Sequence, residues 1–518
     1  MSPECALPGL RWSTAGVRLP GMRIVSWVLC GFVAVASAIA RPFTVAAYNV
    51  ENLHDADGVA EFDDYKAERY TKTHVLTKVQ NAARLMAQFE NGRGPDVIMF
   101  NEIEVDFTPA TTPLDFDAIL KQYAGVKIED MLGAKFTPEI GDLPAEALLV
   151  KAFADRGLTG YHVVVPASFA AADSTRTLGQ KCVLFTRFPV KAARTHVTAD
   201  ARPILEALLE VDGAPLYVFV NHWKSGASDA VTEKTRIANA QTLRTRIDEI
   251  LRADPSADII LGGDLNSQYN QSQRYASAMP QTAINTTLGS QGNELAVRDQ
   301  RDLYNLWYEL PPAQRGSDTY RGEWGTLMHL IVSRGLYDYR GVQYVDNSFA
   351  VGKFIGVNAD AAGLPVRWNG EGPTGSGFSD HFPLIAHFTT VTDNRTDRFV
   401  ELKNPGVERP EAEVIEKIDY AGFDLEKVAV RPDQIGAEGI RNQAFNGKVF
   451  RVEGKVTDAA RQSVEFRGEV YEIYSYDAAV RDKLKATYPP GSTIKFYGEL
   501  SQYQTRWQFV VQDASWVK

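Results

Sequence analysis

Cysteine is scarce in this chain of 518 residues, which has only three, at Cys5, Cys30 and Cys182. So few cysteines cannot form the disulfide framework on which small secreted domains rely, so the fold must depend on the burial of apolar side chains. The sequence also lacks fixed-period repeats and low-complexity tracts. Its composition, 44% hydrophobic and 23% charged, is that of a globular protein, and its length predicts more than one domain.

Basic residues are in the minority, with 55 Lys and Arg against 65 Asp and Glu, and the net charge is -10. The molecule as a whole would repel the polyanionic backbone of nucleic acid. Any binding of nucleic acid must therefore come from a local basic surface or from metal ions.

Long apolar runs are limited to one near the N-terminus, Ile24 to Ala36, which is shorter than the roughly 18–20 residues of a membrane span. Arg23 precedes this run and Ala38-Ile39-Ala40 follows it, which is the pattern of a secretory signal. We expect cleavage before Arg41 and a secreted or periplasmic protein that is free of the membrane afterwards. An uncleaved membrane anchor is the alternative.

The segment 41–390 alternates predicted strands with predicted helices, which is typical of a layered α/β domain. Helical spacing of apolar residues predicts helices at 75–89 and 236–251. Most of the strands end in a polar residue, so a site is expected along one sheet edge. The predicted strands are Phe43–Val50, Val97–Phe100, Val183–Thr186, Leu216–Val220 and Asp258–Leu261.

Residues 391–440 are rich in proline and acidic residues and are interpreted as a linker. Residues 441–518 hold four β-rich stretches with a short helix between the second and the third, the order of an OB-type barrel. This module has 12 Lys and Arg against 9 Asp and Glu, and its aromatic residues are interleaved with basic ones, as single-stranded nucleic acid would require. Burial in the barrel core is the alternative for each aromatic. They are Tyr474, Tyr476, Tyr497, Tyr503, Trp507 and Phe509, beside Lys455, Arg467, Lys495 and Arg506.

The strongest chemical motif is Ile259 to Asn266, an apolar strand that breaks at two glycines and then presents Asp264 and Asn266. If the backbone stays extended, positions two apart face the same way, so both side chains can address one phosphate and its attacking water. A turn capped by Asp264, with Asn266 in a left-handed conformation, is the structural alternative.

Two further motifs carry histidines. Ser379-Asp380-His381 follows a glycine-bearing loop, and Asn221-His222-Trp223-Lys224 follows a predicted strand. Imidazole and ammonium groups in such positions suit an anionic oxygen. Each histidine could equally be a surface residue with a local hydrogen bond.

Two strand ends complete the pattern. Glu102, after Val97–Phe100, is a hard oxygen ligand of the kind that Mg²⁺ takes, and Asn49 ends the first strand. Read alone, either residue could be a solvated strand terminus. Five separate segments nevertheless supply groups that phosphoryl transfer uses.

The order of these motifs resembles the endonuclease/exonuclease/phosphatase superfamily over roughly Phe43 to Phe388, and Tyr48 to Leu53 looks most like its secreted bacterial nuclease branch. The resemblance implies a four-layer α/β sandwich, with two packed sheets flanked by helices, and Mg²⁺ as cofactor, or Mn²⁺ or Ca²⁺. Glu102 would be the principal metal ligand, with Asn49 beside it and Asp380 as a second ligand or orienting acid.

The same resemblance implies the catalytic roles. Asp264 would orient or deprotonate the attacking water, Asn266 would hydrogen-bond the phosphoryl group, and His222 and His381 would grip the phosphate or shuttle protons. The sequence departs from the family at Met328, in the segment Trp324 to Leu330, where an aspartate that orients the final histidine is expected. We therefore expect either a slow enzyme or a substitute acid, with Glu323 and Asp318 as candidates.

The leading hypothesis is a metal-dependent phosphodiesterase that hydrolyses DNA or RNA. A phosphatase or phospholipase-type hydrolase of small or lipid phosphoesters suits the acidic surface equally, and a catalytically weakened protein that binds nucleic acid or glycan is the third hypothesis. The sequence implies no stable protein partner and gives no oligomeric state.

Overall fold

The computed structural model describes residues 41–108, 115–169, 178–292, 301–402, 415–437, 439–442, 445–458, 462–503 and 506–518. The predicted signal at residues 1–40 lies outside these ranges, and so do residues 403–414 of the predicted linker. None of the helices within the described ranges combines the length and the apolar character needed to cross a membrane.

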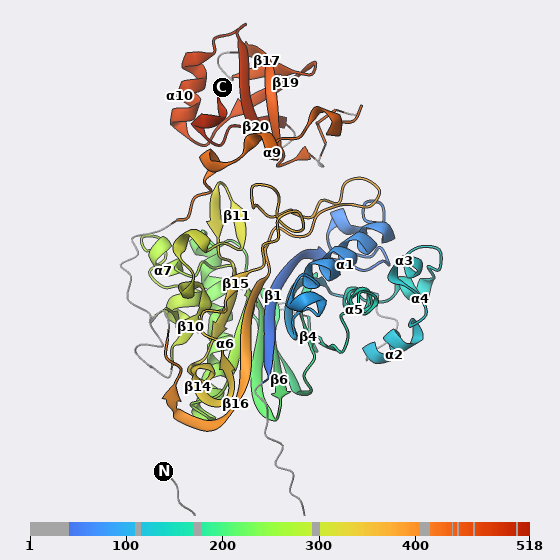
Figure 1. Ribbon diagram of the computed structural model, residues 1–518, viewed down its shortest axis with the longest axis vertical. Coiled ribbons are helices and arrows are strands. Elements are labelled where there is room, and N and C mark those ends of the chain that lie inside the picture. Colours follow the sequence, from blue (N-terminus) through green and yellow to red (C-terminus); the bar gives the residue numbers. More distant parts are fainter. Residues whose placement is uncertain are drawn as a thin grey trace, which may run out of the picture. The chain divides into compact units, whose positions relative to one another are not determined.

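Two sheets of seven strands form the body of the region between residues 42 and 399 (Figure 1). The first has the order β14-β16-β1-β2-β4-β3, with β15 on β16, and the second has the order β5-β6-β7-β8-β13-β10-β9. The strands of the first sheet are β1 (Pro42–Leu53), β2 (Val97–Glu104), β3 (His162–Val164), β4 (Gln180–Thr186), β14 (Asp338–Tyr344), β15 (Ala350–Val351) and β16 (Leu384–Phe399). Those of the second are β5 (Val190–Thr198), β6 (Ala201–Val211), β7 (Ala214–His222), β8 (Ile259–Asp264), β9 (Ser290–Gln291), β10 (Leu303–Asn305) and β13 (Met328–Val332). A separate hairpin consists of β11 (Asp318–Tyr320) and β12 (Glu323–Gly325).

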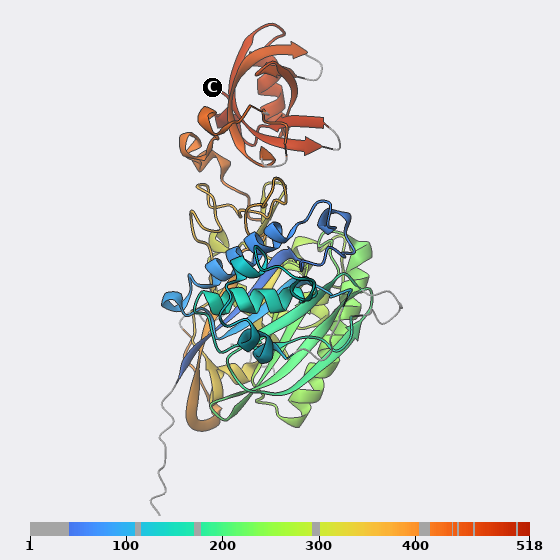
Figure 2. The same ribbon diagram turned by 90° about the vertical axis from the view of Figure 1, so that its right-hand side faces the viewer.

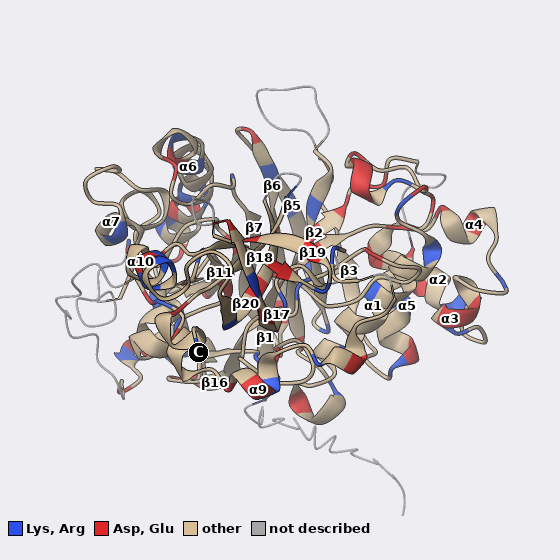
Figure 3. Ribbon diagram, turned by 90° about the horizontal axis from the view of Figure 1, so that it is seen from above, with Lys and Arg blue, Asp and Glu red and all other residues tan. Residues whose placement is uncertain are grey.

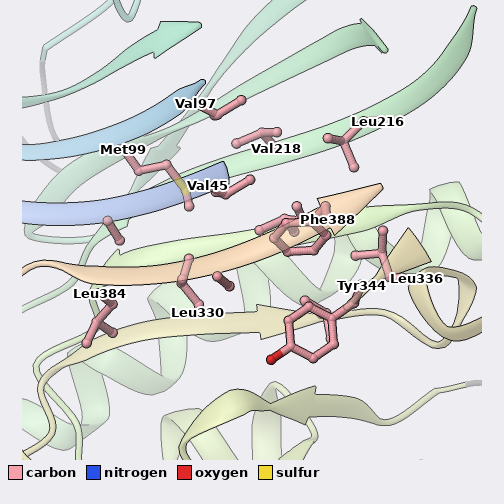
Figure 4. Packing of buried hydrophobic residues seen from close by; sticks show 14 of the residues in the cluster. Val45, Val97, Met99, Leu216, Val218, Leu330, Leu336, Tyr344, Leu384 and Phe388 are labelled. Carbon is pink, nitrogen blue, oxygen red and sulfur yellow. The ribbon is translucent and has the colours of Figure 1, made fainter. Parts of the chain in front are cut away.

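The main core lies between the two sheets. Val45 and Met99 of the first sheet pack with Val218 and Leu330 of the second, and all four are fully buried (Figure 4). Each apolar side chain of this size stabilises the fold by about 1.5–3 kcal/mol when it is removed from water. The two sheets therefore form one rigid support for the polar side chains at their strand ends.

Helices cover the outer faces of both sheets. Helices α1 (Lys72–Met86) and α5 (Ala145–Asp155) pack on the first sheet, and α6 (Ala230–Ala253) packs on the second (Figure 1). Because strands covered on both faces are apolar throughout, they appear in the sequence as continuous apolar runs. The predicted four-layer α/β sandwich is confirmed.

Helix α6 connects two neighbouring parallel strands, β7 and β8. It begins after Asp229, whose side chain accepts a hydrogen bond from the backbone N–H of Val231. It ends before Pro255, since the residue that precedes a proline disfavours helical backbone. The crossover brings the carboxyl ends of β7 and β8 side by side, at His222 and Asp264.

The C-terminal module is a closed barrel with the strand order β17-β18-β19-β21-β20, and its strands curl around one core (Figure 2). The second predicted β-rich stretch holds two of the five strands, because Arg467 and Gly468 both adopt positive φ and form a tight hairpin turn. The elements are β17 (Val449–Asp458), β18 (Ser463–Phe466), β19 (Glu469–Tyr474), α10 (Ala478–Thr487), β20 (Thr493–Tyr503) and β21 (Arg506–Val510).

The barrel aromatics divide between the core and the surface. Tyr497 and Phe509 are buried core residues, whereas Tyr476 and Tyr503 are more than half exposed. Blue Lys and Arg segments and red Asp and Glu segments are scattered along the ribbon of the whole molecule (Figure 3). Tyr474 and Trp507 are partly buried, so Tyr476 and Tyr503 are the most accessible of the six rings for stacking on a ligand.

Candidate metal and phosphate site

Two pairs of parallel strands bring the candidate residues together. Strands β1 and β2 run parallel with Asn49 opposite Asn101, and β7 and β8 run parallel with His222 opposite Asp264. Because parallel strands end at the same sheet edge, each pair presents its polar residues together. The tight packing of the two sheets then places the two edges face to face.

A β-bulge directs Glu102 into the site. Glu51, Asn52 and Glu102 all have positive φ, and the register of β2 shifts between Phe100 and Ile103. Left-handed backbone in a residue other than glycine costs about 1–3 kcal/mol, so the surroundings must hold it in place. The Glu102 carboxylate is held by the side-chain amide of Asn49 at 2.9 Å and by the backbone N–H of Asn52 at 3.1 Å.

The amide of Asn49 joins two carboxylates. Its Nδ2 donates to Glu102 Oε1 and also, at 3.1 Å, to Asp264 Oδ2. Burial, together with the nearby Asp380 charge, raises the pKa of Glu102, and burial raises the pKa of Asp264. Glu102 is partly buried and Asp264 is buried, with carboxylate oxygens within 4.8 Å of each other, so the two charges repel unless a cation or a proton lies between them.

Glu102, His222 and Asp264 can hold a divalent cation. Their ligand-type atoms all lie within 4.8 Å of one another. Burial, with the Arg202 and His381 charges, lowers the pKa of His222, which keeps its imidazole neutral and able to coordinate. Carboxylate oxygens with one imidazole suit Mg²⁺ or Mn²⁺, so the residues present fit the expected metal.

Asp380 lies beside this group rather than within it. One carboxylate oxygen is 3.7 Å from His381 Nε2, and the other accepts from Arg367 at 3.4 Å. Its hydrogen-bonded neighbour Ser379 donates to the Asn49 carbonyl at 2.7 Å and accepts from the backbone N–H of His381 at 3.1 Å. Ser379 thereby fixes the loop that carries Asp380 and His381 to the end of β1.

The two histidines flank Asp264, His222 from the end of β7 and His381 from the loop before β16. His222 Nε2 lies 3.7 Å and His381 Nε2 lies 3.8 Å from Asp264 Oδ2, and both imidazoles are buried. Burial by itself lowers the pKa of His381, but carboxylates including Asp380 and Asp264 outweigh this effect and raise it to about 9. At neutral pH His381 is therefore a cationic donor, while His222 is a neutral acceptor.

Asn266 is placed by a turn and not by strand alternation. Strand β8 ends at Asp264, and Asn266 adopts a left-handed conformation with φ 46°. Its backbone N–H donates to Asp264 Oδ1 at 2.8 Å, and its side-chain amide donates to the Trp223 carbonyl at 3.2 Å. The extended geometry expected for this pair was wrong, and the turn considered as its alternative is present.

Lys224 turns away from the site. Its ammonium group pairs with Asp200 at 2.8 Å near the surface. The cationic side of the site is built instead from residues that the sequence motifs did not indicate, namely Lys78, Arg202 and Arg367. They come from α1, β6 and a loop, so no local pattern connects them with the strand ends.

Lys78 illustrates how such residues act. Its ammonium group is buried, donates to the Glu51 carbonyl at 2.5 Å and lies 4.5 Å from the centre of the Trp368 ring. Burial lowers its pKa to about 7, although the surrounding carboxylates oppose this shift. The hydrogen bond from Lys78 thus helps to hold the segment at Glu51 in its left-handed conformation.

Asn101 also has a structural role at the site that the sequence motifs did not indicate. It is fully buried, accepts from the backbone N–H of Asp264 at 2.8 Å and donates to the Asn221 carbonyl at 2.9 Å. The side chain therefore links β2 of the first sheet to β7 and β8 of the second, directly below the site. A polar residue next to Glu102 was the only signal for it in the sequence.

Met328 lies opposite Asp264 in the pairing of β13 with β8 and is buried in the main core. Of the two candidate substitute acids, Glu323 is bound to Arg274 at 2.6 Å and is one-third exposed. Asp318 is buried, and its backbone pairs with that of His381. The structure therefore favours Asp318 over Glu323.

The chain thus folds as an α/β sandwich that gathers carboxylate and imidazole groups at its strand ends. Residues 182–390 match the model of a family described as the Endonuclease/Exonuclease/phosphatase family, which supports the superfamily indicated by the motifs. The match includes His222, Asp264 and His381 but not Asn49 or Glu102. A search of curated proteins gave no match.

Solved structures also match the chain at low identity. A protein of the endonuclease/exonuclease/phosphatase family from Leptotrichia buccalis is 14% identical, with 66% of this chain and 98% of that chain covered and a TM-score of 0.37. Truncated TDP2 from Caenorhabditis elegans is 13% identical, with 68% and 98% covered and a TM-score of 0.35. A family protein from Bacteroides thetaiotaomicron is 13% identical, with 68% and 98% covered and a TM-score of 0.36.

Proposed function

We propose that this chain is a divalent-metal-dependent phosphodiesterase of the endonuclease/exonuclease/phosphatase superfamily, and that its substrate is DNA or RNA. The observation that carries the proposal is the convergence of Glu102, His222 and Asp264 around the bridging amide of Asn49. Two buried ligand groups and the partly buried Glu102, from two different sheets and with cationic side chains beside them, suit an anionic ester better than a neutral substrate.

Glu102 is the principal ligand in this proposal, with Asn49 fixing its orientation and Asp380 as a further acid at the rim. When bound, a divalent cation would neutralise charge on the phosphoryl oxygens and lower the pKa of a water molecule. The residues of the chain supply the rest of the chemistry by positioning, by proton transfer and by charge stabilisation.

Asp264 is placed to orient or deprotonate the attacking water, because its Oδ1 is held by the backbone of Asn266 and its Oδ2 faces both histidines. The cationic His381 donates to a phosphoryl oxygen or to the leaving group as negative charge develops. His222 remains neutral, and the side-chain amide of Asn266 would hydrogen-bond the phosphoryl group.

The accessory parts follow from the same proposal. Residues 1–40 would direct the chain out of the cytoplasm, and the barrel would be an OB-type module that holds nucleic acid close to the catalytic domain. The exposed rings of Tyr476 and Tyr503 support this role because every base offers a face on which to stack.

The test compares four substrates with the purified protein: plasmid DNA, single-stranded RNA, p-nitrophenyl phosphate and sphingomyelin vesicles. Each is assayed with Mg²⁺, Mn²⁺, Ca²⁺ or a chelator. Metal-dependent cleavage of either nucleic acid supports the proposal. Turnover confined to the monoester or the lipid would replace it with a phosphatase or phospholipase, and binding of nucleic acid without any turnover would replace it with a binding protein.

A further inference from the structure

The His381 imidazole lacks a hydrogen-bond partner on one of its two nitrogens. Its Nε2 faces Asp264 and Asp380, whereas Nδ1 is buried and is bonded to no other group of the described chain. An imidazole that transfers or donates a proton works best when its other nitrogen is held, because that contact fixes the tautomer and the ring plane. Another side chain should therefore support His381.

Met328 does not supply this support. It lies on β13 opposite Asp264, but its side chain is fully buried in the apolar core between the sheets. A thioether is also a weak acceptor of hydrogen bonds.

Asp318, at the start of β11, pairs through its backbone with His381, which lies in another segment of the chain. The two residues form an isolated antiparallel bridge, and the N–H of Phe382 donates to the Ser317 carbonyl at 2.6 Å. The Asp318 carboxylate is buried, and its Oδ1 accepts from the Ser317 hydroxyl at 2.8 Å and from the backbone N–H of Leu327 at 3.1 Å.

Space for the carboxylate is provided by the opposite strand of the hairpin. Gly325 faces Asp318 in the pairing of β11 with β12, and a Cβ atom at Gly325 would lie 2.0 Å from Asp318 Oδ2. Any larger residue at this position would displace the carboxylate. The hairpin is thus shaped to keep Asp318 beside the loop that carries His381.

We propose that Asp318 is a positioning residue that orients His381, from a different strand than the one on which Met328 lies. The inference rests on the proposed function, because it assumes that His381 acts on a phosphoryl group. Orienting contacts of this kind are worth about 10–100-fold in rate.

The experiment is a double-mutant cycle on the full chain, with bis-p-nitrophenyl phosphate as substrate. Asp318→Asn keeps the shape and the acceptor of the side chain but removes its charge, so we expect kcat to fall about 10–100-fold with KM almost unchanged. In the His381→Ala background the same substitution should change the residual kcat less than about threefold. Glu323→Gln, from the same hairpin, is the matched control and should leave kcat as it is.

Gly325→Ala is the second variant, because its methyl group would displace the Asp318 carboxylate while Asp318 and His381 both keep their own side chains. It should lower kcat in the wild type and have little further effect on Asp318→Asn, and it keeps the test decisive if Asp318→Asn does not fold. If kcat is unchanged in Asp318→Asn, or falls equally with and without His381, the role of Asp318 is overturned while the proposed function stands. Full activity of His381→Ala would remove the proposed catalytic site and the inference together.

Discussion

The side chain of Asn101, on the first sheet, accepts a hydrogen bond from the backbone N–H of Asp264, on the second sheet, at 2.8 Å. Both residues are buried, so the bond is shielded from water and its loss would leave a buried donor without a partner. This contact fixes the distance between the strand end that carries Glu102 and the strand end that carries Asp264. The geometry of the site therefore depends on how closely the two sheets approach.

Gly263 allows this approach and should not tolerate a side chain. It has φ 113°, and a Cβ atom there would lie 2.2 Å from the Asn221 carbonyl oxygen and 2.9 Å from Asn101 Oδ1. We predict that Gly263→Ala lowers the free energy of unfolding by more than about 3 kcal/mol, measured by urea denaturation. Gly213→Ala, at a turn with φ 91° and open space around it, is the control and should cost only about 1–2 kcal/mol. Equal losses would show that backbone strain alone is responsible.

Glu309 should make stability depend on pH. Its carboxyl is buried and accepts from the hydroxyl groups of Tyr337 at 3.1 Å and Tyr344 at 2.6 Å. Burial raises its pKa from 4.5 to about 7, despite the hydrogen bond from Tyr344. Because the folded-state pKa is the higher one, the protonated carboxyl contributes stability below about pH 4.5, and this contribution is lost as the pH rises through about 7.

Between pH 5 and pH 8 we therefore expect the free energy of unfolding of the wild type to fall by about 2–3 kcal/mol more than that of Glu309→Gln, which stays neutral. The surface variant Glu210→Gln, which loses an exposed ion pair with Lys191, controls for the change in net charge. Parallel pH profiles of the wild type and Glu309→Gln would contradict the prediction.

The exposed aromatics of the barrel should contribute to the binding of nucleic acid. We predict that Tyr476→Ala and Tyr503→Ala together weaken the affinity for a single-stranded oligonucleotide at least tenfold, because stacking on one ring is worth about 1–3 kcal/mol. Fluorescence anisotropy measures the affinity. Hydrolysis of bis-p-nitrophenyl phosphate should not change, and the exposed aliphatic Val470 offers a matched control as Val470→Ala. Unaltered affinity would remove the proposed role of the barrel.

Much of the fold could be predicted from the sequence because its central strands are covered on both faces. Strands β1, β2, β7 and β8 appear as continuous apolar runs, and each ends at a polar residue that the parallel pairing carries to the site. Strand β6, which holds an arginine, a proline and two glutamates among its apolar residues, was not predicted. The short strands β10, β11 and β12 are held by their partners and leave no periodic pattern.

The site was less predictable than the fold, because its geometry depends on backbone that local patterns do not reveal. A β-bulge turns Glu102 toward the site, and it requires positive φ at Glu102, which a glutamate seldom adopts. Asn266 is held in place by a turn. Arg202 lies outside every motif, and the sequence offered Asp318 only as one of two candidate acids. Three-dimensional packing, and not spacing along the chain, determines which charged residues meet at the site.

Two substitutions test the assigned roles within the site. We predict that Asp264→Asn and His381→Ala each reduce kcat by about 10²–10⁴, since each removes a group that transfers a proton or holds charge at the phosphoryl group. Both variants should keep the circular dichroism spectrum of the wild type. Near-normal rates in both folded variants would show that the chemistry takes place elsewhere.

A variant of Glu102 tests most directly whether the chain is a metal-dependent phosphodiesterase, because Glu102 is proposed as the principal metal ligand. The decisive measurement is the rate of bis-p-nitrophenyl phosphate hydrolysis as a function of Mg²⁺ or Mn²⁺ concentration, for the wild type and for Glu102→Gln. The account predicts a saturable dependence on metal that a chelator abolishes, and a loss of at least about 10-fold in apparent metal affinity for Glu102→Gln. Hydrolysis that proceeds undiminished in the chelator, or the same metal dependence in both proteins, would contradict it.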